Sequence, residues 1–566
     1  MKPRFVAGPP GTGKTHGFLV EKYREGFLKY GPDKIVLLSH TNTAANQIID
    51  AILKMKEVKE QGYDKIYFED RICTIHHFCR SKIMKKEVFD NKQSDDYNKL
   101  CSLPGGVAFR LAKFTGDVYK NHPFFKFISH AHGKDLSDDL EKHFNTCADR
   151  QEYYPYKYPQ LQKLNVIYTK YKKDTIQHDF ADMLNEFNSL ENILDIEMLI
   201  VDEAQDCNKP QLRAINKMAQ NVKDEHFYMV GDPDQTIFEF AGSDAHYFHT
   251  ISADPYRELE NGKRCSKAVN AYCKKTIAPI WKKYGYVRKW YPATYDDDYH
   301  GKRNLIPEGF KHGDLIEGNK YDLTDLNPSK SLSFLLDKMR NSNQNFLFCY
   351  RGKPTDKRIT KFLKDNGFEF SYVEGSAHVS KEELRCHNEW PSFYEGSLKS
   401  KSQIKQFWKY LGKKAIPVGK GTFTFEDWIN KDYSIDDLIK EGLLKDKNFL
   451  KSSFDLIRKR SKGKDEKEHE DRMIYIKNVI RNGFDYDAKI RIEHGNIHKV
   501  KGMTYDNVIG DLTLTRKKPE PEYVQYRLKF TMFSRAIFDI WVLATSTGKE
   551  LGKYGCTPKT IERLIL

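Results

Sequence analysis

Short runs of hydrophobic residues rich in Val, Ile, Leu and Phe alternate along this chain with longer amphipathic stretches. Apolar runs of this length, with no polar position between, are typical of strands that are buried on both faces of a sheet. The run at residues 35–38 precedes a stretch in which Ala44, Ile48 and Ile52 recur at helical spacing. The alternation predicts an α/β fold with open parallel sheets. Strands are expected at residues 4–7, 35–38, 198–201, 227–230, 346–350, 508–510 and 540–543.

The alternation is interrupted twice, and the interruptions suggest how the chain divides into domains. Residues 81–175 are rich in Lys, Asp and Tyr, which predicts a mostly helical insertion. Residues 380–488 contain a block of charges at 458–472 and no strand–helix rhythm. We therefore predict two parallel-sheet domains, each carrying an insertion. The first domain is expected at 1–80 and 176–250 with insertion 81–175, and the second at 251–379 and 489–566 with insertion 380–488.

A glycine-rich segment follows the first predicted strand and opens a helical pattern. Its sequence, GPPGTGKT, fits the G-x-x-x-x-G-K-[ST] pattern of a phosphate-binding loop in the strand–loop–helix context that the pattern requires. Backbone N–H groups of such a loop surround phosphate oxygens at a helix N-terminus. Lys14 is expected to reach the β- and γ-phosphates and Thr15 to bind Mg²⁺. A glycine- and proline-rich turn that contains a lysine by chance would not account for this position between a strand and a helix. Nucleotide contacts are predicted for Gly8, Pro9, Pro10, Gly11, Thr12, Gly13, Lys14, Thr15 and His16.

Two carboxylates and a glutamine follow later predicted strands. Asp202 ends the run 198–201 and is expected to hold Mg²⁺ beside Thr15. Glu203 comes next and can accept a proton from an attacking water. Gln235 follows the run 227–230 and would place an amide near the γ-phosphate, although alone it would be read as a solvated turn residue. Together these residues predict hydrolysis of a nucleoside triphosphate.

The charge of the chain suggests its partner. Among 566 residues, Lys and Arg number 94 and Asp and Glu 79, a net charge of +15. Such an excess favours a polyanion such as nucleic acid. The ten cysteines form no C-x-x-C pair, which argues against zinc and disulfides and favours a reducing cytosol. No apolar run reaches 18 residues, so no membrane segment is expected, and the early first strand leaves no room for a signal peptide.

The acidic segment DEAQD and the later VGDPDQ, in this order after GPPGTGKT, resemble superfamily 1 helicases of the UvrD/Rep type. Individually these blocks are weak, but as an ordered series they are specific. They span residues 5–545, almost the whole chain. Further blocks that resemble the family lie at residues 39–45, 74–79, 179–184, 259–266, 496–505 and 533–536.

The resemblance implies two RecA-like domains with the nucleotide in the cleft between them. By position, Arg264 and Arg535 match the arginines that the second domain points at the γ-phosphate, and Gly502 matches a nucleotide-binding position; for either arginine a surface ion pair is the alternative. Phe240 matches a tryptophan on which a base stacks, unless it is a core phenylalanine. The residues that the resemblance assigns to single-stranded DNA are Thr41, Asn42, His76, Phe240 and His498.

The chain departs from the family at base and sugar recognition. Only seven residues precede Gly8, so the family's glutamine block is missing. Lys263 stands in place of a base-stacking tyrosine, and Thr504 in place of a ribose-binding glutamate. We therefore expect poor discrimination among nucleoside triphosphates. The blocks differ in the polarity of movement that they suggest. Three segments look closer to the 5′-to-3′ branch of superfamily 1, namely the phosphate-binding loop and the blocks at residues 496–505 and 533–536. The middle blocks look UvrD-like, and we favour 3′-to-5′ movement.

These observations lead to one functional hypothesis and three alternatives. We expect an ATP-dependent DNA helicase and single-strand translocase that uses ATP, or other NTPs, with Mg²⁺. Its expected partners are single-stranded DNA, tailed duplex DNA and proteins of replication, repair or defence, in the nucleoid-bearing cytoplasm of a bacterial or phage-infected cell. The alternatives are a nucleoprotein remodeller or motor subunit with little unwinding of its own, an RNA helicase, and a binding protein with a vestigial site. No nuclease domain is expected.

Overall fold

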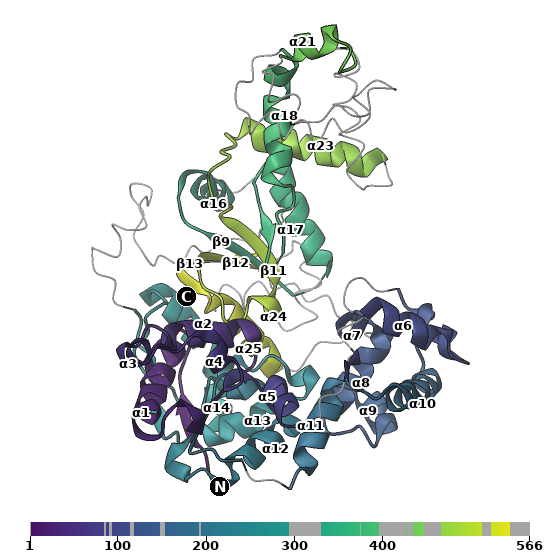
Figure 1. Cartoon of the computed structure of the whole chain (residues 1–566). Helices are drawn as coiled ribbons and strands as arrows, with labels where there is room; N and C mark the ends of the chain where they lie inside the picture. Colours follow the sequence, from purple (N-terminus) through teal and green to yellow (C-terminus); the bar gives the residue numbers. More distant parts are fainter. Residues whose placement is uncertain are drawn as a thin grey trace.

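The structure is a computed structural model of the whole chain (Figure 1). It describes residues 2–83, 87–89, 93–113, 118–147, 153–191, 194–293, 330–351, 353–373, 375–395, 426, 434–446, 466–511 and 522–543. Most of the predicted insertion 380–488 lies outside these ranges.

The first sheet is six-stranded and fully parallel, in the order β3-β2-β6-β7-β1-β8. Its last strand, β8, pairs with β1 and lies beyond the predicted domain boundary at residue 250. The strands are β1 (Arg4–Ala7), β2 (Ile35–Ser39), β3 (Ile72–Thr74), β6 (Met198–Val201), β7 (Phe227–Gly231) and β8 (Arg257–Glu258).

Helices cover both faces of this sheet, which explains its uninterrupted apolar strands. Because neighbouring strand residues point to opposite faces, Leu37 packs with one set of helices and Leu38 with the other. The first set is α1 (Val20–Tyr30), α2 (Asn42–Ile52), α3 (Lys56–Glu60) and α4 (Lys65–Glu69). The second set is α5 (Ile75–Lys82), α11 (Phe180–Ser189), α12 (Lys209–Met218) and α13 (Ala245–Ile251).

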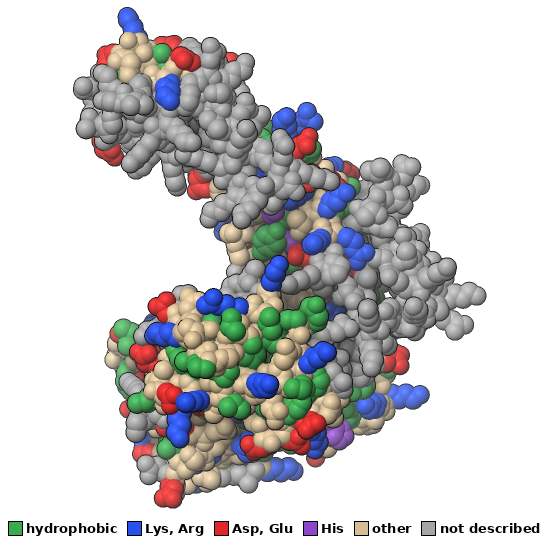
Figure 2. Space-filling model, turned by 90° about the vertical axis from the view of Figure 1, so that its right-hand side faces the viewer, with side chains coloured by type: hydrophobic (Ala, Val, Ile, Leu, Met, Phe, Trp, Pro, Cys, Tyr) green, Lys and Arg blue, Asp and Glu red, His purple; other side chains and the backbone are tan. Residues whose placement is uncertain are grey.

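A helical unit with its own aromatic core leaves the first domain between α5 and α11. Tyr153 and Tyr156 of the tyrosine- and proline-rich segment are buried in this core, so they pack rather than offer a surface. In Figure 2 the lower body, seen from the side of this unit, carries hydrophobic side chains among isolated lysines and arginines. Its helices are α6 (Gln93–Ser102), α7 (Val118–Asn121), α8 (Pro123–Gly133), α9 (Leu140–Thr146) and α10 (Tyr158–Thr175).

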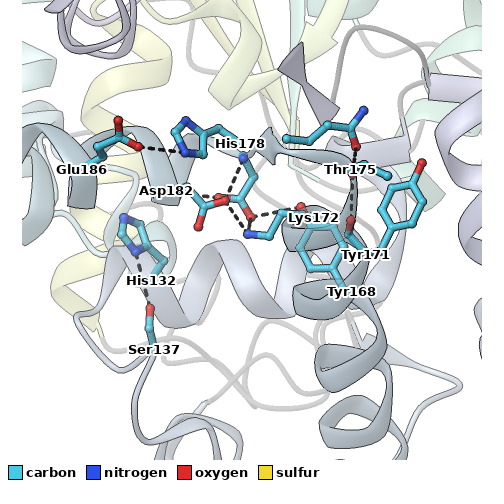
Figure 3. A network of polar contacts seen from close by, with 11 residues as sticks. His132, Ser137, Tyr168, Tyr171, Lys172, Thr175, His178, Asp182 and Glu186 are labelled. Atoms are coloured by element: carbon cyan, nitrogen blue, oxygen red, sulfur yellow. Dashed lines mark hydrogen bonds and ion pairs between the residues drawn. The ribbon is translucent and has the colours of Figure 1, made fainter. Parts of the chain in front are cut away.

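A buried charge network joins this unit to the first domain (Figure 3). The chain leaves and returns through a parallel pair, β4 (Glu87–Val88) with β5 (Gln177–His178). The Lys172 ammonium donates to Asp179 and Asp182 at 2.6 Å each, and the Tyr168 hydroxyl donates to Asp179 at 3.0 Å. Asp179 also caps α11. Since Asp179 is buried and is paired with the mostly buried Lys172, the network fixes α10 on α11.

The second sheet is five-stranded and also fully parallel, in the order β10-β11-β9-β12-β13. Its strands are β9 (Phe346–Tyr350), β10 (Ser371–Tyr372), β11 (Ile492–Asn496), β12 (Tyr505–Asp511) and β13 (Ala536–Leu543). One face packs on α14 (Lys267–Tyr284), α24 (Ile497–Val500) and α25 (Glu522–Phe533). The other packs on α16 (Lys330–Asn341), α17 (Lys353–Asp365), α18 (Lys381–Tyr394) and α23 (Glu466–Arg481).

The two sheets lie one above the other, and α24 and α25 are at their junction (Figure 1). The helices α18 and α23 extend on the side away from the first sheet, towards α21 (Ile435–Lys440). The fold class predicted from the sequence, two parallel-sheet domains of RecA type, is confirmed.

Candidate active site and nucleic-acid interface

The carboxyl ends of three adjacent strands bring the predicted nucleotide residues together. In the first sheet β6, β7 and β1 are neighbours, and parallel strands end at the same edge. Gly8 follows β1, Asp202 follows β6 and Asp232 follows β7. Residues from three distant parts of the chain therefore meet at this edge.

The phosphate-binding loop is held on the sheet by its own backbone. The Gly8 N–H donates to the Gly231 carbonyl of β7 at 3.0 Å. Gly11 and Gly13 have φ values of +72° and +82°, which favour glycine over any residue with a Cβ. The buried Lys14 ammonium donates to the Gly8 carbonyl at 2.8 Å, so it lies inside the loop.

The other predicted loop contacts lie in the same turn. Pro9 and Pro10 are buried, and the Thr12 hydroxyl donates to the Pro9 carbonyl at 2.8 Å. Thr15 is half-buried in the π-helical turn Lys14–Leu19 that leads into α1. The side chain of His16 lies outside what the structure describes.

The two acidic residues after β6 have opposite pKa shifts. Burial, together with the charge of Glu203, raises the pKa of Asp202 to about 7. Burial also disfavours the Glu203 carboxylate, but Lys14 and Lys501 outweigh it and lower the pKa of Glu203 to about 2. The buried Oδ1 atom of Asp202 makes no hydrogen bond with any residue that the structure describes. A carboxylate oxygen left free in this way suits a Mg²⁺ ligand, and a cation there would favour the ionised form.

A chain of amide and carboxylate contacts connects Glu203 with Gln235. The Gln205 side chain donates to Glu203 at 2.5 Å and accepts from the Asp232 N–H at 3.0 Å. The Gln235 amide donates to the other end of Asp232, at Oδ2, at 2.7 Å. Gln235 is buried in this network and is not a solvated turn residue. A movement of the Gln235 side chain can thus be transmitted to Glu203 through Asp232 and Gln205.

Both predicted arginines lie near this edge, on the side of the second domain, and the Arg264 guanidinium donates to the Ser534 carbonyl at 3.4 Å. A Cβ on Gly11 would lie 2.4 Å from the Arg264 Cβ, and the Lys263 N–H donates to the Gly11 carbonyl at 2.7 Å. The Arg535 guanidinium donates to the Gln235 side chain and, at 3.0 Å, to the Ser534 hydroxyl. Arg535 is buried and donates here to neutral groups.

Arg535 is buried, and this changes its titration. Burial and the nearby charge of Arg264 lower the pKa of Arg535 to about 10, while Glu203 acts in the opposite direction. The guanidinium remains charged at neutral pH. Two positive charges held close together in a buried place are suited to a strongly anionic ligand.

Phe240 and His498 meet in an aromatic cluster at the junction of the two domains. The ring of Phe240 lies edge-on to His498, with centroids 5.3 Å apart, and Phe238 lies 5.6 Å from His498. Phe238 also contacts His40, at the end of β2, at 5.9 Å. Phe240 is half-buried, so it is neither a core residue nor a fully open platform.

The other predicted strand contacts lie at the carboxyl ends of β2 and β3. Thr41 and Asn42 are exposed, and the Thr41 hydroxyl caps α2 by accepting the Ala44 N–H at 3.1 Å. His76 is half-buried in α5 with its ring 5.2 Å from Phe180. Burial and the charge of His40 lower the pKa of His76 to about 4, so it is neutral at pH 7.

Comparison with known proteins agrees with this geometry. Residues 1–255 match the family model described as UvrD/REP helicase N-terminal domain. The chain is similar to the ATP-dependent DNA helicase Rep of Buchnera aphidicola subsp. Acyrthosiphon pisum, 21% identical over 451 residues that cover 76% of this chain and 64% of the relative. The N-terminal part of the chain, residues 1–255, is thus similar to the N-terminal domain of UvrD/REP helicases.

Two further proteins are similar to this chain. The protein of the same name from Buchnera aphidicola subsp. Schizaphis graminum is 26% identical over 417 residues, 68% of this chain and 56% of that protein. A probable DNA helicase II homolog of Mycoplasma capricolum subsp. capricolum is 24% identical over 267 residues, 42% of this chain and 33% of that protein. The chain spans less than two thirds of the length of each of these relatives.

Several residues at the junction escaped the sequence analysis. Lys501 donates to both carboxylate oxygens of Asp206, and buried Arg527 donates to the Thr236 carbonyl at 2.9 Å. Trp281 donates to Asp234 at 2.7 Å. Lys501 and Asp206 belong to blocks that carry the family resemblance, so the resemblance could have identified them as residues of the site. Arg527 and Trp281 lie outside those blocks, and nothing in the sequence singles them out.

Gly502 lies next to Lys501 with a φ of +86°, and a Cβ there would meet no atom within 4 Å. Glycine is therefore favoured here by the backbone conformation, since a side chain would meet no steric clash. In the described part of the chain, no helix is long and apolar enough to cross a membrane, and no three His, Cys, Asp or Glu side chains are grouped to hold a metal ion.

Proposed function

We propose that this chain is an ATP-dependent DNA helicase that moves along single-stranded DNA and separates duplexes. One observation carries the proposal. Arg264 abuts the phosphate-binding loop, and Arg535 bonds Gln235 at the edge where the loop, Asp202 and Glu203 meet. A triphosphate in the loop would have charged groups of both domains around it. The names of the bacterial relatives support the assignment to DNA.

The chemistry follows from the positions of the side chains. The loop N–H groups and Lys14 would bind the phosphates, and Thr15 and Asp202 would hold Mg²⁺, which neutralises phosphate charge when it is bound. Glu203 is ionised at neutral pH and can orient a water and accept its proton. Negative charge on a bound triphosphate would raise the pKa of Glu203 and make it a better base. The two arginines would stabilise the charge of the transition state.

Movement would come from opening and closing of the junction between the domains. Hydrolysis removes the γ-phosphate and so weakens the attraction between the bound nucleotide and the two arginines, Arg264 and Arg535. The aromatic cluster of Phe238, Phe240 and His498 spans the same junction, and its parts belong to both domains. A change in domain spacing would therefore alter the grip on stacked bases. We propose 3′-to-5′ movement.

We also propose that the site accepts several nucleoside triphosphates. The Lys263 side chain lies along the phosphate-binding loop, with Nζ 3.6 Å from the position of a Cβ on Gly13. A cation there would attract phosphate and would not read a base. Values of kcat/KM for ATP, GTP and CTP are expected to agree within about tenfold, a window of about 1.4 kcal/mol. A preference for ATP of a hundredfold or more would contradict this part of the proposal.

Unwinding of tailed duplexes tests the activity. The wild type should separate a DNA duplex that carries a 3′ single-stranded tail and leave one with a 5′ tail intact, and Lys14→Ala should be inactive on both. The same duplexes with RNA tails test the nature of the track. Strand-stimulated hydrolysis without separation of any duplex would instead favour a motor subunit or nucleoprotein remodeller.

The proposed setting follows from these substrates. We place the protein on single-stranded and tailed duplex DNA in the cytoplasm of a bacterial or phage-infected cell, and its protein partners would be those of replication, repair or defence. The bacterial sources of its relatives support this setting.

A further inference from the structure

Lys501 occupies a buried position between the two domains. Its ammonium donates to Asp206 Oδ1 at 2.6 Å, to Asp206 Oδ2 at 2.5 Å and to the Gln235 carbonyl at 2.7 Å. An ammonium has three N–H donors, so these three contacts use all of them. The side chains of Lys501 and Asp206 are only 9% and 3% exposed. Lys501 is on the second-domain side, whereas Asp206 and Gln235 follow strands of the first sheet.

The acceptors of Lys501 belong to the segments that carry the proposed hydrolytic residues. Asp206 ends the 3₁₀ turn Ala204–Asp206, and its N–H donates to the Glu203 carbonyl at 3.0 Å. Glu203 itself has a φ of +48°, a conformation that non-glycine residues adopt only when the surroundings impose it. The Ser243 hydroxyl donates to the Asp206 carbonyl at 2.7 Å and holds the turn from the other side. Lys501 thus restrains the end of a short turn whose start is Glu203.

The same ammonium also contacts the aromatic cluster. It lies 5.4 Å from the centroid of the Phe238 ring, within the range of a cation–π interaction. Phe238 is in ring contact with His498 and His40, from the second and first domains respectively. A base that enters this cluster and displaces Phe238 would change the surroundings of the Lys501 ammonium. Lys501 is therefore in contact with the strand-facing rings and with the turn that bears Glu203.

We propose that Lys501 is a positioning residue that transmits occupancy of the aromatic cluster to Glu203 and Gln235 through its contacts with Asp206 and the Gln235 carbonyl. This inference rests on the proposed function, since it concerns how strand binding stimulates hydrolysis. Within the described residues, the hydrogen bonds and ion pairs of Lys501 go to Asp206 and Gln235 and not to the phosphate-binding loop. Its effect is expected on the turnover number and on stimulation by DNA, and much less on binding of either ligand.

The test compares four variants and one matched control variant with the wild type. Lys501→Gln and Asp206→Asn each remove one charge of the pair, and the double variant removes both. Lys501→Arg keeps the positive charge. Lys499→Gln is the matched control, because Lys499 is exposed in helix α24, which ends one residue before Lys501, and the substitution changes the charge equally. For each protein, kcat and the KM for ATP are measured with and without oligo(dT), and the Kd for oligo(dT) is measured by fluorescence anisotropy.

Lys501→Gln is expected to lower the ratio of DNA-stimulated to basal kcat at least tenfold, with the KM and the oligo(dT) Kd within about threefold of the wild type. Asp206→Asn should do the same, and the double variant should be no worse than either single one, since two residues that act as a unit are not additive. Lys501→Arg should recover part of the stimulation. Lys499→Gln should behave as the wild type.

Three results would overturn the inference. These are a stimulation ratio for Lys501→Gln within twofold of the wild type, additive losses in the double variant, or a loss of oligo(dT) affinity as large as the loss of stimulation. Thermal melting identifies variants that fail to fold. If Lys501→Gln does not fold, Lys501→Arg is used for the test instead. If the Lys501–Asp206 pair were purely structural, Lys501→Arg would have the stability of the wild type and the same stimulation by DNA as the wild type. If hydrolysis by the wild type did not respond to DNA, the proposed function itself would be contradicted. This outcome is distinct from the three that would overturn the role of Lys501.

Discussion

Replacement of Arg535 by Ala removes a buried charge from the proposed cleft. The guanidinium bonds the Gln235 side chain, the Ser534 hydroxyl and the Thr531 carbonyl, so it lies beside Gln235 and not on the phosphate-binding loop. An arginine that stabilises a phosphoryl-transfer transition state is worth about 10³–10⁵ in rate, or about 4–7 kcal/mol. We expect Arg535→Ala to lower kcat by that factor, while the KM for ATP changes by about threefold or less.

The variant also has a cost in stability that must be separated from its effect on catalysis. It removes the Arg535 donor from the buried Gln235 side-chain oxygen, at about 1–3 kcal/mol for an unsatisfied group, whereas the Thr531 carbonyl still accepts from the Ser534 hydroxyl at 3.1 Å. Steady-state hydrolysis with saturating single-stranded DNA gives kcat and KM, a fluorescent ATP analogue gives binding, and urea unfolding gives the free energy of unfolding. Arg213→Ala is the control, since Arg213 forms an exposed ion pair with Asp135 that is worth about 0–1 kcal/mol. A folded Arg535→Ala protein that binds ATP and retains kcat within tenfold of the wild type would refute the reasoning.

Three further predictions follow from the site. Lys14→Ala and Glu203→Gln should each abolish hydrolysis yet bind oligo(dT) within about threefold of the wild type; unwinding by either would contradict the mechanism. Phe240→Ala should weaken oligo(dT) binding by about 1–3 kcal/mol, the value of one stacked base, and an unchanged Kd would show that Phe240 is only a packing residue. Burial lowers the pKa of His76 to about 4, so it stabilises the fold above pH 6.5 and that stability is lost as the pH falls towards 4. His76→Asn should therefore reduce the slope of unfolding free energy against pH by up to about 1.4 kcal/mol per unit in this interval, and equal slopes for the two proteins would contradict it.

The strands and the chemistry that follows them could be predicted because both depend on local sequence. The apolar run before Asp202 specifies a buried strand, and a parallel sheet brings its carboxyl end to the phosphate-binding loop. The contacts across the domain junction could not be predicted in this way. Lys501 and Asp206 are 295 positions apart, and Trp281 of α14, a helix that packs on the second sheet, donates to Asp234 of the first domain. Such pairs depend on how two finished domains meet, which no local pattern records. The roles of the individual site residues stay predictions until they are measured.

Hydrolysis of ATP in the presence and absence of single-stranded DNA, measured together with displacement of streptavidin from either end of that strand, is the most direct test of a motor driven by one cleft. The account predicts that DNA stimulates hydrolysis, that streptavidin is displaced from the 5′ end only, and that Glu203→Gln abolishes both. Hydrolysis that is indifferent to DNA, or displacement that persists in Glu203→Gln, would contradict it.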